Sequence, residues 1–300
     1  MSNVTYVTHD KSGGIPNNTT IETELQGDGS QRQVVAIRTP SDSSPIYTSN
    51  RLNYLSELAL GNITSRTSVN KFGAAPDGVQ ITSTDIWDRA NAAATQQIWL
   101  APTAARVHAI VSSDAADTGF NVRVYGLTSW DTAETSELVA LNGTTPVNTS
   151  NSYVIIHRMK CIYTAAKTTN AGTISATAAT DSTVTALILA GNGQTEMAIY
   201  GVPSTQKALL HRWNCQIDKT TAAAVSADFR LFVNENPNVQ TTGFLRKDDM
   251  SLQSTGTSAF ERVYAIPPVY SGPCIIKVNA IGSAADIDGE SGFDLELVTI

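Results

Sequence analysis

The chain has 300 residues and a formal net charge of -7; hydrophobic residues make up 41% of it and charged residues only 16%. This charged share is well below the ~25% of typical soluble domains. The negative balance, with no basic run longer than Arg246-Lys247, argues against a nucleic-acid-binding protein. No stretch approaches ~18 consecutive apolar residues, and the N-terminus lacks the basic and apolar regions of a signal peptide. We therefore expect no membrane partner and synthesis in a cytoplasm.

The first 67 residues differ in amino-acid composition from the rest. They are rich in Gly, Asn and Ser, with one expected strand in "QVVAIRT" at 33–39. In "SNRLNYLSELALGN" at 49–62, Leu52, Leu55 and Leu58 follow a helical spacing and Gly61 provides a stop, which predicts one short amphipathic helix. We interpret 1–67 as an N-terminal arm or small attachment segment, and 68–300 as one β-sandwich domain.

The second part of the chain reads as a series of short strands. Runs rich in Val, Ile, Tyr and Phe are separated by clusters of Gly, Asn, Asp, Pro and Ser. The expected strands lie within 96–102, 105–113, 120–128, 152–163, 172–178, 185–190, 196–203, 207–217, 227–235, 261–270, 274–283 and 293–300. Without long helical patterns between them, they predict an all-β fold: an antiparallel β-sandwich, jelly-roll-like.

Two of these strands carry a histidine and a cysteine. In the first strand, alternation places Tyr153, Ile155, His157, Met159, Cys161 and Tyr163 on one face. We interpret His157 as a buried histidine with a hydrogen-bonded ring. The second strand groups His211, Trp213 and Cys215 in the same way, with Leu209 and Ile217.

A zinc site formed by the two His-Cys pairs is the alternative. Each pair is separated by about 13 Å along its strand, whereas structural zinc sites use local ligand pairs. The three cysteines, Cys161, Cys215 and Cys274, are an odd number without CxxC spacing. We therefore expect reduced, buried thiols, and neither a disulfide framework nor a metal.

Other polar motifs have simpler interpretations than chemistry. The sequons at Asn142 and Asn148 are expected to be turn residues, because no signal segment provides a secretory route. "DIDGES", with Asp286, Asp288 and Glu290, lacks the full spacing of a calcium loop and predicts a solvated turn.

Paired carboxylates and tryptophans give no catalytic assignment either. Asp85 with Asp88, and Glu134 with Glu137, have no partner pattern that would define an acid and a base. The four tryptophans could stack on sugars, but packing is the expected use; they are Trp87, Trp99, Trp130 and Trp213. We predict no catalytic, cofactor-binding or metal-binding residues, and no enzyme.

An ordered series of segments between about 68 and 235 resembles a group of tailed-bacteriophage virion structural proteins. The series is "SVNKFGAAPDGVQITSTDIWDRA", "VSSDAADT", "VRVYGLTSW", "LNGTTPVNTSNSYVIIHRM", "NAGTISATA" and "GNGQTEMAIYGVPSTQKALL". The specificity of the resemblance comes from this order. The loops "NAAATQQIW" and "DAADTGFNV" depart from the group's usual Gly-rich turns, which bears on partner choice more than on fold.

The resemblance implies a non-enzymatic β-sandwich protein of the phage particle. The leading hypothesis is a capsid decoration or cement protein on the outer surface of the head. It would bind the major capsid protein and form a homo-oligomer, with a trimer suiting a threefold capsid position. The alternatives are a tail or neck protein that contacts a host glycan or receptor, and a carbohydrate-active enzyme on a jelly-roll scaffold.

Overall fold

The computed structural model describes residues 51–89, 96–218, 224–238, 243–255 and 257–300, together with the backbone of two strands nearer the N-terminus. The chain divides into two compact units, Met1–Thr64 and Ser65–Ile300. No helix among the described residues is long and apolar enough to span a membrane.

The described part of the first unit holds two strands and one helix. Strands β1 (Ile21–Leu25) and β2 (Gln31–Val35) pair antiparallel, and β2 overlaps the expected strand at 33–39. The expected helix is confirmed as α1 (Arg51–Ala59). It ends where expected: Gly61 adopts a φ of 73°, its N–H bonds to the carbonyl of Leu58, and the N–H of Asn62 bonds to that of Glu57. This is the Schellman arrangement, which favours glycine at the left-handed position.

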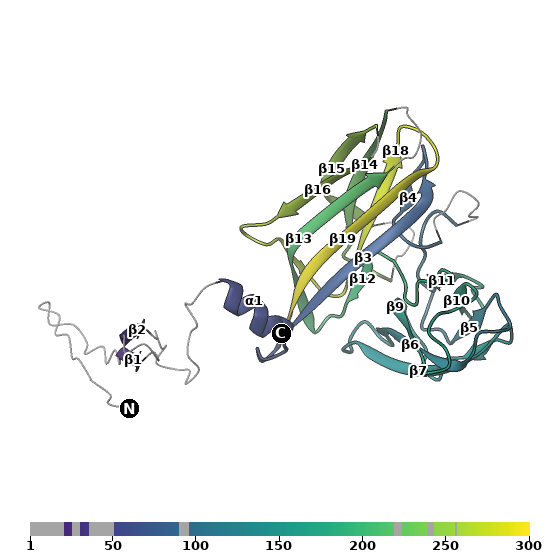
Figure 1. Ribbon diagram of the computed structural model, residues 1–300, viewed down its shortest axis with the longest axis horizontal. Helices are drawn as coiled ribbons and strands as arrows, with labels where there is room; N and C mark the ends of the chain where they lie inside the picture. Colours follow the sequence, from purple (N-terminus) through teal and green to yellow (C-terminus); the bar gives the residue numbers. More distant parts are fainter. Residues whose placement is uncertain are drawn as a thin grey trace, which may run out of the picture. The chain divides into compact units, whose positions relative to one another are not determined.

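The second unit contains a jelly roll (Figure 1). Its strands are β3 (Arg66–Val79), β4 (Thr84–Asp85), β12 (Ile199–Val202), β13 (Gln206–Asp218), β14 (Val225–Asn234), β15 (Phe244–Ser254), β16 (Ser258–Val263), β17 (Val269–Ser271), β18 (Cys274–Gly282) and β19 (Ile287–Thr299). One sheet has the order β16-β13-β19-β3, and the other β12-β18-β14-β15 with β4 also on β18.

Strand pairing in this sandwich is nested. The first strand pairs with the last (β3 with β19), the next with the last but one (β4 and β12 with β18), and β13 pairs with β16 and β17. The innermost pair, β14 with β15, is a hairpin. A long antiparallel ribbon folded over itself in this way is a jelly roll, so the expected fold class is confirmed.

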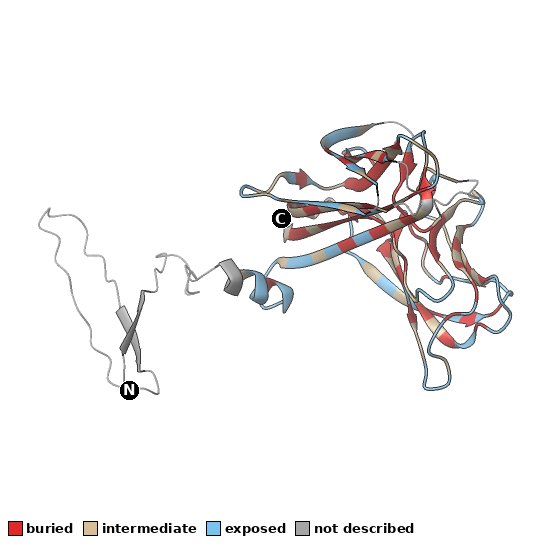
Figure 2. Cartoon of the chain, turned by 45° about the horizontal axis from the view of Figure 1, so that its top comes forward, coloured by how far each residue is buried: buried red, intermediate tan, exposed pale blue. Residues whose placement is uncertain are grey.

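Buried residues alternate with more exposed ones along many of the strands (Figure 2). The largest fully buried side chains of the jelly roll include Trp213 of β13, Phe229 of β14 and Phe293 of β19. Full burial of each such side chain contributes about 1.5–3 kcal/mol relative to exposure.

The alternation predicted for β13 is wrong over its first half. The register of β13 against β19 shifts between Leu210 and Arg212, so His211 is an extra, bulged residue. The buried row is Ala208, Leu210, Trp213, Cys215 and Ile217, whereas Leu209 and His211 are only half-buried. A β-bulge inverts the facing of every residue on one side of it, which a strict period of two cannot anticipate.

A second group of strands is inserted into the jelly roll between β4 and β12. It comprises β5 (His108–Ser112), β6 (Thr118–Leu127), β7 (Thr135–Asn142), β8 (Val147–Asn148), β9 (Ile155–Ile162), β10 (Ile174–Ala178) and β11 (Val184–Ile188). These strands form two antiparallel sheets, in the orders β11-β10-β5-β8 and β7-β6-β9. We call residues 103–195 the inserted lobe.

The chain enters and leaves the inserted lobe beside β18. Three backbone hydrogen bonds of 3.0–3.1 Å meet here. The N–H of Ile86 donates to the carbonyl of Val278, the N–H of Val278 donates to the carbonyl of Ala198, and the N–H of Ala198 donates to the carbonyl of Ile86. Trp87 and Met197 then form an isolated bridge. We call residues 86–88 and 196–198 the neck.

Strand β3 crosses the neck at Gly73. A Cβ at this position would stand 2.3 Å from the backbone nitrogen of Ala198 and 2.6 Å from the carbonyl oxygen of Ile86. Only glycine allows this approach between two backbones. The glycine in "KFGAAP" therefore marks the point where β3 passes the base of the lobe.

A buried ionic cluster lies next to the neck. The carboxylate of Asp85, which is fully buried, accepts hydrogen bonds from Lys277 Nζ at 2.6 Å, Asn279 Nδ2 at 3.0 Å and the backbone N–H of Trp99 at 2.8 Å. The last bond fixes 96–102, which was predicted to be a strand and is an irregular segment instead. The prediction failed because Trp99 is buried as the anchor of a loop, and its ring N–H donates to the carbonyl of Thr185.

Replacing Asp85 by alanine should lower the free energy of unfolding by about 3–5 kcal/mol, because it leaves the buried ammonium of Lys277 without its counter-ion. Urea unfolding measures this. The double variant Asp85→Ala/Lys277→Met should recover part of the loss, since it removes the unpaired charge. Asp131→Ala is the control: among the described residues this exposed carboxylate accepts a hydrogen bond from Ser204 Oγ alone, and its loss should cost less than about 1 kcal/mol. If Asp85→Ala lowers the free energy of unfolding by as little as Asp131→Ala does, the ionic cluster does not stabilise the fold as described.

Candidate functional site

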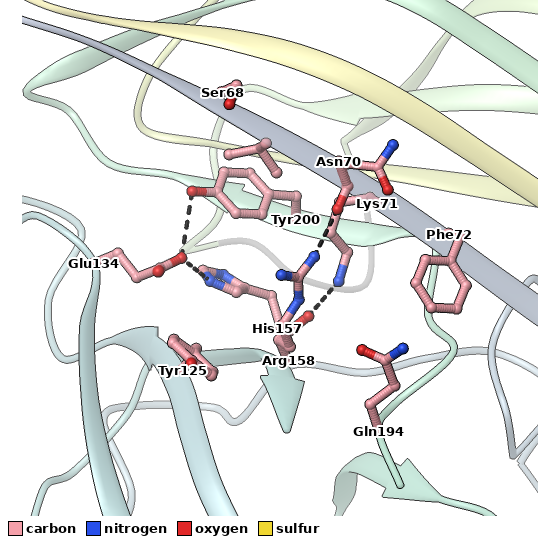
Figure 3. A pocket seen from close by; sticks show the side chains of 11 residues that line it. Ser68, Asn70, Lys71, Phe72, Tyr125, Glu134, His157, Arg158, Gln194 and Tyr200 are labelled. Atoms are coloured by element: carbon pink, nitrogen blue, oxygen red, sulfur yellow. Dashed lines mark hydrogen bonds and ion pairs between the residues drawn. The ribbon is translucent and has the colours of Figure 1, made fainter. Parts of the chain in front are cut away.

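A cavity of about 430 Å³ lies between β3 of the jelly roll and the inserted lobe (Figure 3). This volume is within the ~300–1,000 Å³ of typical ligand sites. The jelly roll contributes Ser68, Val69, Asn70, Lys71 and Phe72 of β3 and Tyr200 of β12 to its lining. The lobe contributes Tyr125 of β6, His157 and Arg158 of β9, and two residues outside the strands, Glu134 and Gln194. We call it the β3–lobe pocket.

The histidine of this pocket sits on a bulge. Ile156 pairs with Gly126 and Arg158 pairs with Tyr125, so His157 is an extra residue in β9. As expected, it is buried, with a relative exposure of 1%. The bulge also buries Ile155, Ile156 and His157 consecutively, which breaks the predicted alternation at this point. Bulges commonly redirect a side chain beside a functional site.

The ring of His157 is held between a carboxylate and a phenol. Its Nε2 lies 2.5 Å from Glu134 Oε2, and its ring centroid lies 4.4 Å from that of Tyr200. The hydroxyl of Tyr200 donates to the same Glu134 oxygen at 3.5 Å. Burial lowers the pKa of His157, and this effect outweighs the attraction of Glu134. The imidazole is therefore neutral at pH 7 and donates its Nε2–H to Glu134.

The carboxylate of Glu134 remains ionised. Burial raises the pKa of Glu134. The contact with His157 and the positive charges of Arg158 and Lys71 together lower this pKa by more than burial raises it, so the net shift is downward. The phenol of Tyr200 stays neutral because burial raises its pKa well above the ordinary value. The pocket thus holds one anion, Glu134, fixed by two neutral donors.

Two cationic side chains face the same space. Lys71, with 3% exposure, donates from Nζ to the backbone carbonyl of His157. Arg158 donates from one terminal nitrogen to the backbone carbonyl of Asn70 at 2.6 Å. Burial lowers the pKa of Lys71 strongly, and the nearby charge of Arg158 lowers it further. These two bonds run in opposite directions between β3 and β9, so they join the jelly roll to the lobe.

The paired carboxylates that the sequence singled out do not converge. Glu137 accepts from the backbone N–H groups of Ser150 and Asn151 and from Tyr153 Oη, at 2.7–3.0 Å. It therefore stabilises a turn of the lobe, whereas Glu134 lies in the pocket. Asp85 belongs to the ionic cluster with Lys277.

Asp88 is a structural residue of the neck. Its Oδ2 accepts the N–H of Glu196 at 2.8 Å, and its own N–H donates to the carbonyl of Glu196 at 3.0 Å. Burial raises the pKa of Asp88 to about 8, against the opposing effect of the Glu196 hydrogen bond. Its other carboxyl oxygen is buried without a partner among the described residues. Asp88 is therefore protonated at neutral pH.

His211 and Cys215, one of the two His-Cys pairs, have other partners in the structure. The ring of His211 bonds to Glu296 at 2.9 Å, and Cys215 Sγ lies 3.5 Å from Ser291 Oγ. No group of three or more metal-binding side chains occurs among the residues that the structure describes. The three cysteines are free and buried, as expected. Burial raises the pKa of the Cys161 thiol to about 11 and that of Cys274 to about 12, which makes both unreactive.

The remaining motifs have structural roles. Asn142 ends β7, and its carbonyl accepts from the N–H of Thr145 in the following turn, as expected for a turn residue. Asn148 was also expected in a turn, but it pairs with Ala109 as the last residue of the short strand β8. Asp286 lies in an exposed turn, but Asp288 and Glu290 belong to β19, so the predicted turn is shorter than expected. All four tryptophans are buried, which confirms packing as their use.

A smaller cavity of about 170 Å³ is lined by Phe72 and Gly73 of β3, with Glu196 and Glu290 among its other lining residues. It is below the size of typical ligand sites. Its two carboxylates have no histidine or cation beside them in its lining. We therefore take the β3–lobe pocket as the candidate functional site.

Sequence reasoning did not identify this pocket. It had considered His157 and Glu134, but not Lys71, Arg158 or Tyr200 as companions. Lys71 interrupts a strand that is otherwise uncharged from Thr67 to Pro76, which is the one local signal. The convergence itself depends on the bulge in β9 and on the path of β3 past the neck.

Comparison with known proteins gives little further information. No known family model matches the chain, and no curated protein matches it in sequence. Solved structures with some similarity include that of infectious bursal disease virus Gt strain, with 10% identity, a TM-score of 0.18, and coverage of 82% of this chain and 78% of that one. The structure of the Gx strain of the same virus has 9% identity and a TM-score of 0.20, with coverage of 78% of this chain and 71% of that one.

The VP2 subviral particle of that virus gives 11% identity and a TM-score of 0.19, with coverage of 83% and 78%. At these TM-scores the likeness carries no argument about this chain. Its function has to be inferred from its own residues.

Replacing Asp88 by asparagine should make the protein more stable than the wild type in alkaline solution. The folded chain keeps the proton of Asp88 up to about pH 8, whereas the unfolded chain loses it near the ordinary value of 3.8. The wild type therefore loses stability as pH rises through this window, and the asparagine variant lacks this loss. Urea unfolding measures the free energy of unfolding of both proteins at pH 5 and pH 9. The advantage of Asp88→Asn over the wild type should grow by a few kcal/mol from pH 5 to pH 9, since each unit of pKa shift corresponds to about 1.4 kcal/mol.

Asp131→Asn serves as the control for this measurement, because Asp131 is exposed. It should follow the wild type at both pH values. If the gap between Asp88→Asn and the wild type is the same at pH 5 and pH 9, the neck carboxyl is not protonated in the folded protein.

Proposed function

We propose that this chain is a structural component of a bacteriophage virion, and specifically a decoration or cement protein on the outer surface of the capsid. The observation that carries the proposal is the ordered series of segments between 68 and 235. These segments cover most of β3, the neck, much of the inserted lobe, β12 and the first residues of β13. The resemblance therefore includes the first strands of the jelly roll together with its insertion.

The fold is compatible with this role but does not establish it. Jelly rolls occur in viral capsid proteins and also in lectins and enzymes, so function has to be argued from sites. The low charge of the chain favours large neutral interfaces, because it reduces repulsion between many neighbouring copies. We propose a non-enzymatic protein, since only one carboxylate, Glu134, lines the pocket and glycoside hydrolysis ordinarily needs two.

One edge of the jelly roll has the properties of a docking surface. Within the described residues β16 has a neighbour on one side only, β13, so it is an edge strand. Large apolar side chains are exposed on it, on the connection to β17 and at the first residue of β17. They are Phe260, Val263, Ile266 and Val269, with Ile266 at 88% exposure. We call these four residues the β16–β17 edge.

We propose that the β16–β17 edge contacts the major capsid protein. An exposed apolar group of this kind marks an interaction site, and a free strand edge can add main-chain bonds to a partner's sheet. Residues 1–67 are proposed as a second attachment segment. Self-association is part of the proposal, and a trimer would match threefold positions on a capsid.

The second candidate is a protein of the phage tail, or of the junction between phage head and tail, that contacts the host surface. The observation that favours it is the β3–lobe pocket, whose size and polar lining suit a small surface ligand. Quantitative mass spectrometry of purified virions separates the two candidates. A head decoration protein should be present in roughly hundreds of copies, as the symmetry of a capsid requires. A dozen copies or fewer would contradict the decoration role.

The double variant Ile266→Asp/Val269→Asp should bind undecorated heads at least ~10-fold more weakly than the wild type, because two charges would have to be buried at the contact. Co-sedimentation with heads purified from a deletion phage measures this. Leu138→Asp is the matched control: Leu138 is 50% exposed on β7 of the lobe, away from this edge. Equal losses in both variants, or no loss in either, would contradict docking through the β16–β17 edge.

A further inference from the structure

We propose that the β3–lobe pocket binds an acidic saccharide, with the sugar carboxylate held by Arg158 and Lys71 and the ring hydroxyls held by Glu134 and Gln194. This inference goes beyond the virion role, and it rests on the geometry of the pocket alone. It holds whether the protein is located on the head or the tail.

The pocket offers more hydrogen-bond donors than acceptors. Lys71 uses one of its three ammonium hydrogens on the carbonyl of His157, and Arg158 uses one terminal nitrogen on the carbonyl of Asn70. No other described residue accepts a hydrogen bond from either side chain. The hydroxyl of Tyr125 and the side-chain amide of Gln194 also make no hydrogen bond within the described residues. An acceptor-rich ligand would satisfy these donors.

The two cations lie close enough to oppose each other. The charge of Arg158 contributes to the low pKa of Lys71, after burial. An anion placed between them would be attracted by both and would relieve their repulsion. A carboxylate is well suited to this position because a guanidinium can donate to both of its oxygens.

The anionic residue of the pocket indicates that the ligand also donates. Glu134 Oε2 is occupied by His157 and Tyr200, which leaves Oε1 without a partner among the described residues. A compact inorganic anion would be repelled by this carboxylate, whereas a ligand hydroxyl can donate to it. The ligand must therefore carry an anionic group at one end and hydroxyl groups at the other.

The apolar part of the lining fits the same ligand. Phe72 is 39% exposed, and Tyr125 is half-buried on the lobe side. Figure 3 shows Phe72 and Tyr125 at opposite ends of the pocket, with the two cations between them. A sugar ring has an apolar C–H face that packs on an aromatic side chain while its hydroxyls reach polar groups. A pyranose with a carboxylate combines all three features.

The test uses a panel of galacturonic, glucuronic, mannuronic and N-acetylneuraminic acids against the neutral sugars galactose, glucose and mannose. Saturation-transfer NMR of the full-length protein identifies the acid that binds, and calorimetric titration at physiological salt gives its affinity. We expect at least one acid to bind about tenfold or more tightly than every neutral sugar, as a charge-assisted contact implies. Inorganic phosphate at the same concentration should not compete.

Two variants locate the site. Arg158→Gln should weaken binding of the acid about tenfold or more, while Lys207→Gln should change it less than twofold. Lys207 is an exposed cation on β13 outside the pocket lining, so it matches the charge change. Thermal unfolding confirms that both variants are folded, and Glu134→Gln, which keeps the shape of the side chain, tests the hydroxyl contact independently.

Four results would overturn the proposal: no acid of the panel binds, acid and neutral sugars bind equally, phosphate competes equally, or Lys207→Gln weakens binding as much as Arg158→Gln does. Because these measurements use the isolated protein, their failure leaves the virion role untouched. Conversely, absence of the protein from virions would leave the binding result valid.

Discussion

Three backbone hydrogen bonds at the neck hold the rest of the second unit in place. Ile86, Ala198 and Val278 bond to one another in a closed triangle, so the two chain segments that border the inserted lobe are both tied to β18. Strand β18 is the partner of β4 and β12 and also of β14, and its residues from Cys274 to Ala280 are buried. The inserted lobe, residues 103–195, can therefore interrupt the sheet without breaking its hydrogen-bond ladder.

The same constraint creates the β3–lobe pocket. Gly73 lets β3 pass in contact with Ile86 and Ala198, and this places Lys71, two residues earlier, beside the bulge of β9. The ammonium of Lys71 is costly to bury, and its hydrogen bond to the carbonyl of His157 offsets only part of that cost. Charged groups that are buried at a cost in folding stability commonly belong to functional sites. The pocket is thus a consequence of how the lobe is anchored.

Local sequence pattern predicted the central strands of the sheets and some edge strands, but it missed others at the edges. Strands such as β13, β14 and β18 have a neighbouring strand on each side, and they carry many buried apolar residues, alternating in β13 and β14 and consecutive in β18. The missed strands β3, β7 and β15 lie at sheet edges, and "FLRKDDMSLQS" of β15 is largely polar. Edge strands need charged or polar side chains to avoid pairing with other chains, which removes the signal that identifies a strand.

The pocket could be predicted only in fragments, for a related reason. His157 and His211 are both bulged residues, and a bulge leaves no mark in the hydrophobic period. Lys71 and His157 are 86 positions apart, and their meeting depends on the jelly-roll pairing of β3 with β19 and on the neck. The tryptophans and cysteines were easier to assign, because burial alone decides their role.

Native-state hydrogen exchange of the neck amides tests the central claim most directly, namely that the lobe is anchored rigidly enough to preform the pocket. The amides of Ile86, Ala198 and Val278 should exchange only through global unfolding, with the same protection free energy as the core amides of β13 and β14. If these three amides exchange through a low-energy local opening while β13 and β14 remain protected, the lobe is hinged at the neck, and the account of a fixed pocket is wrong.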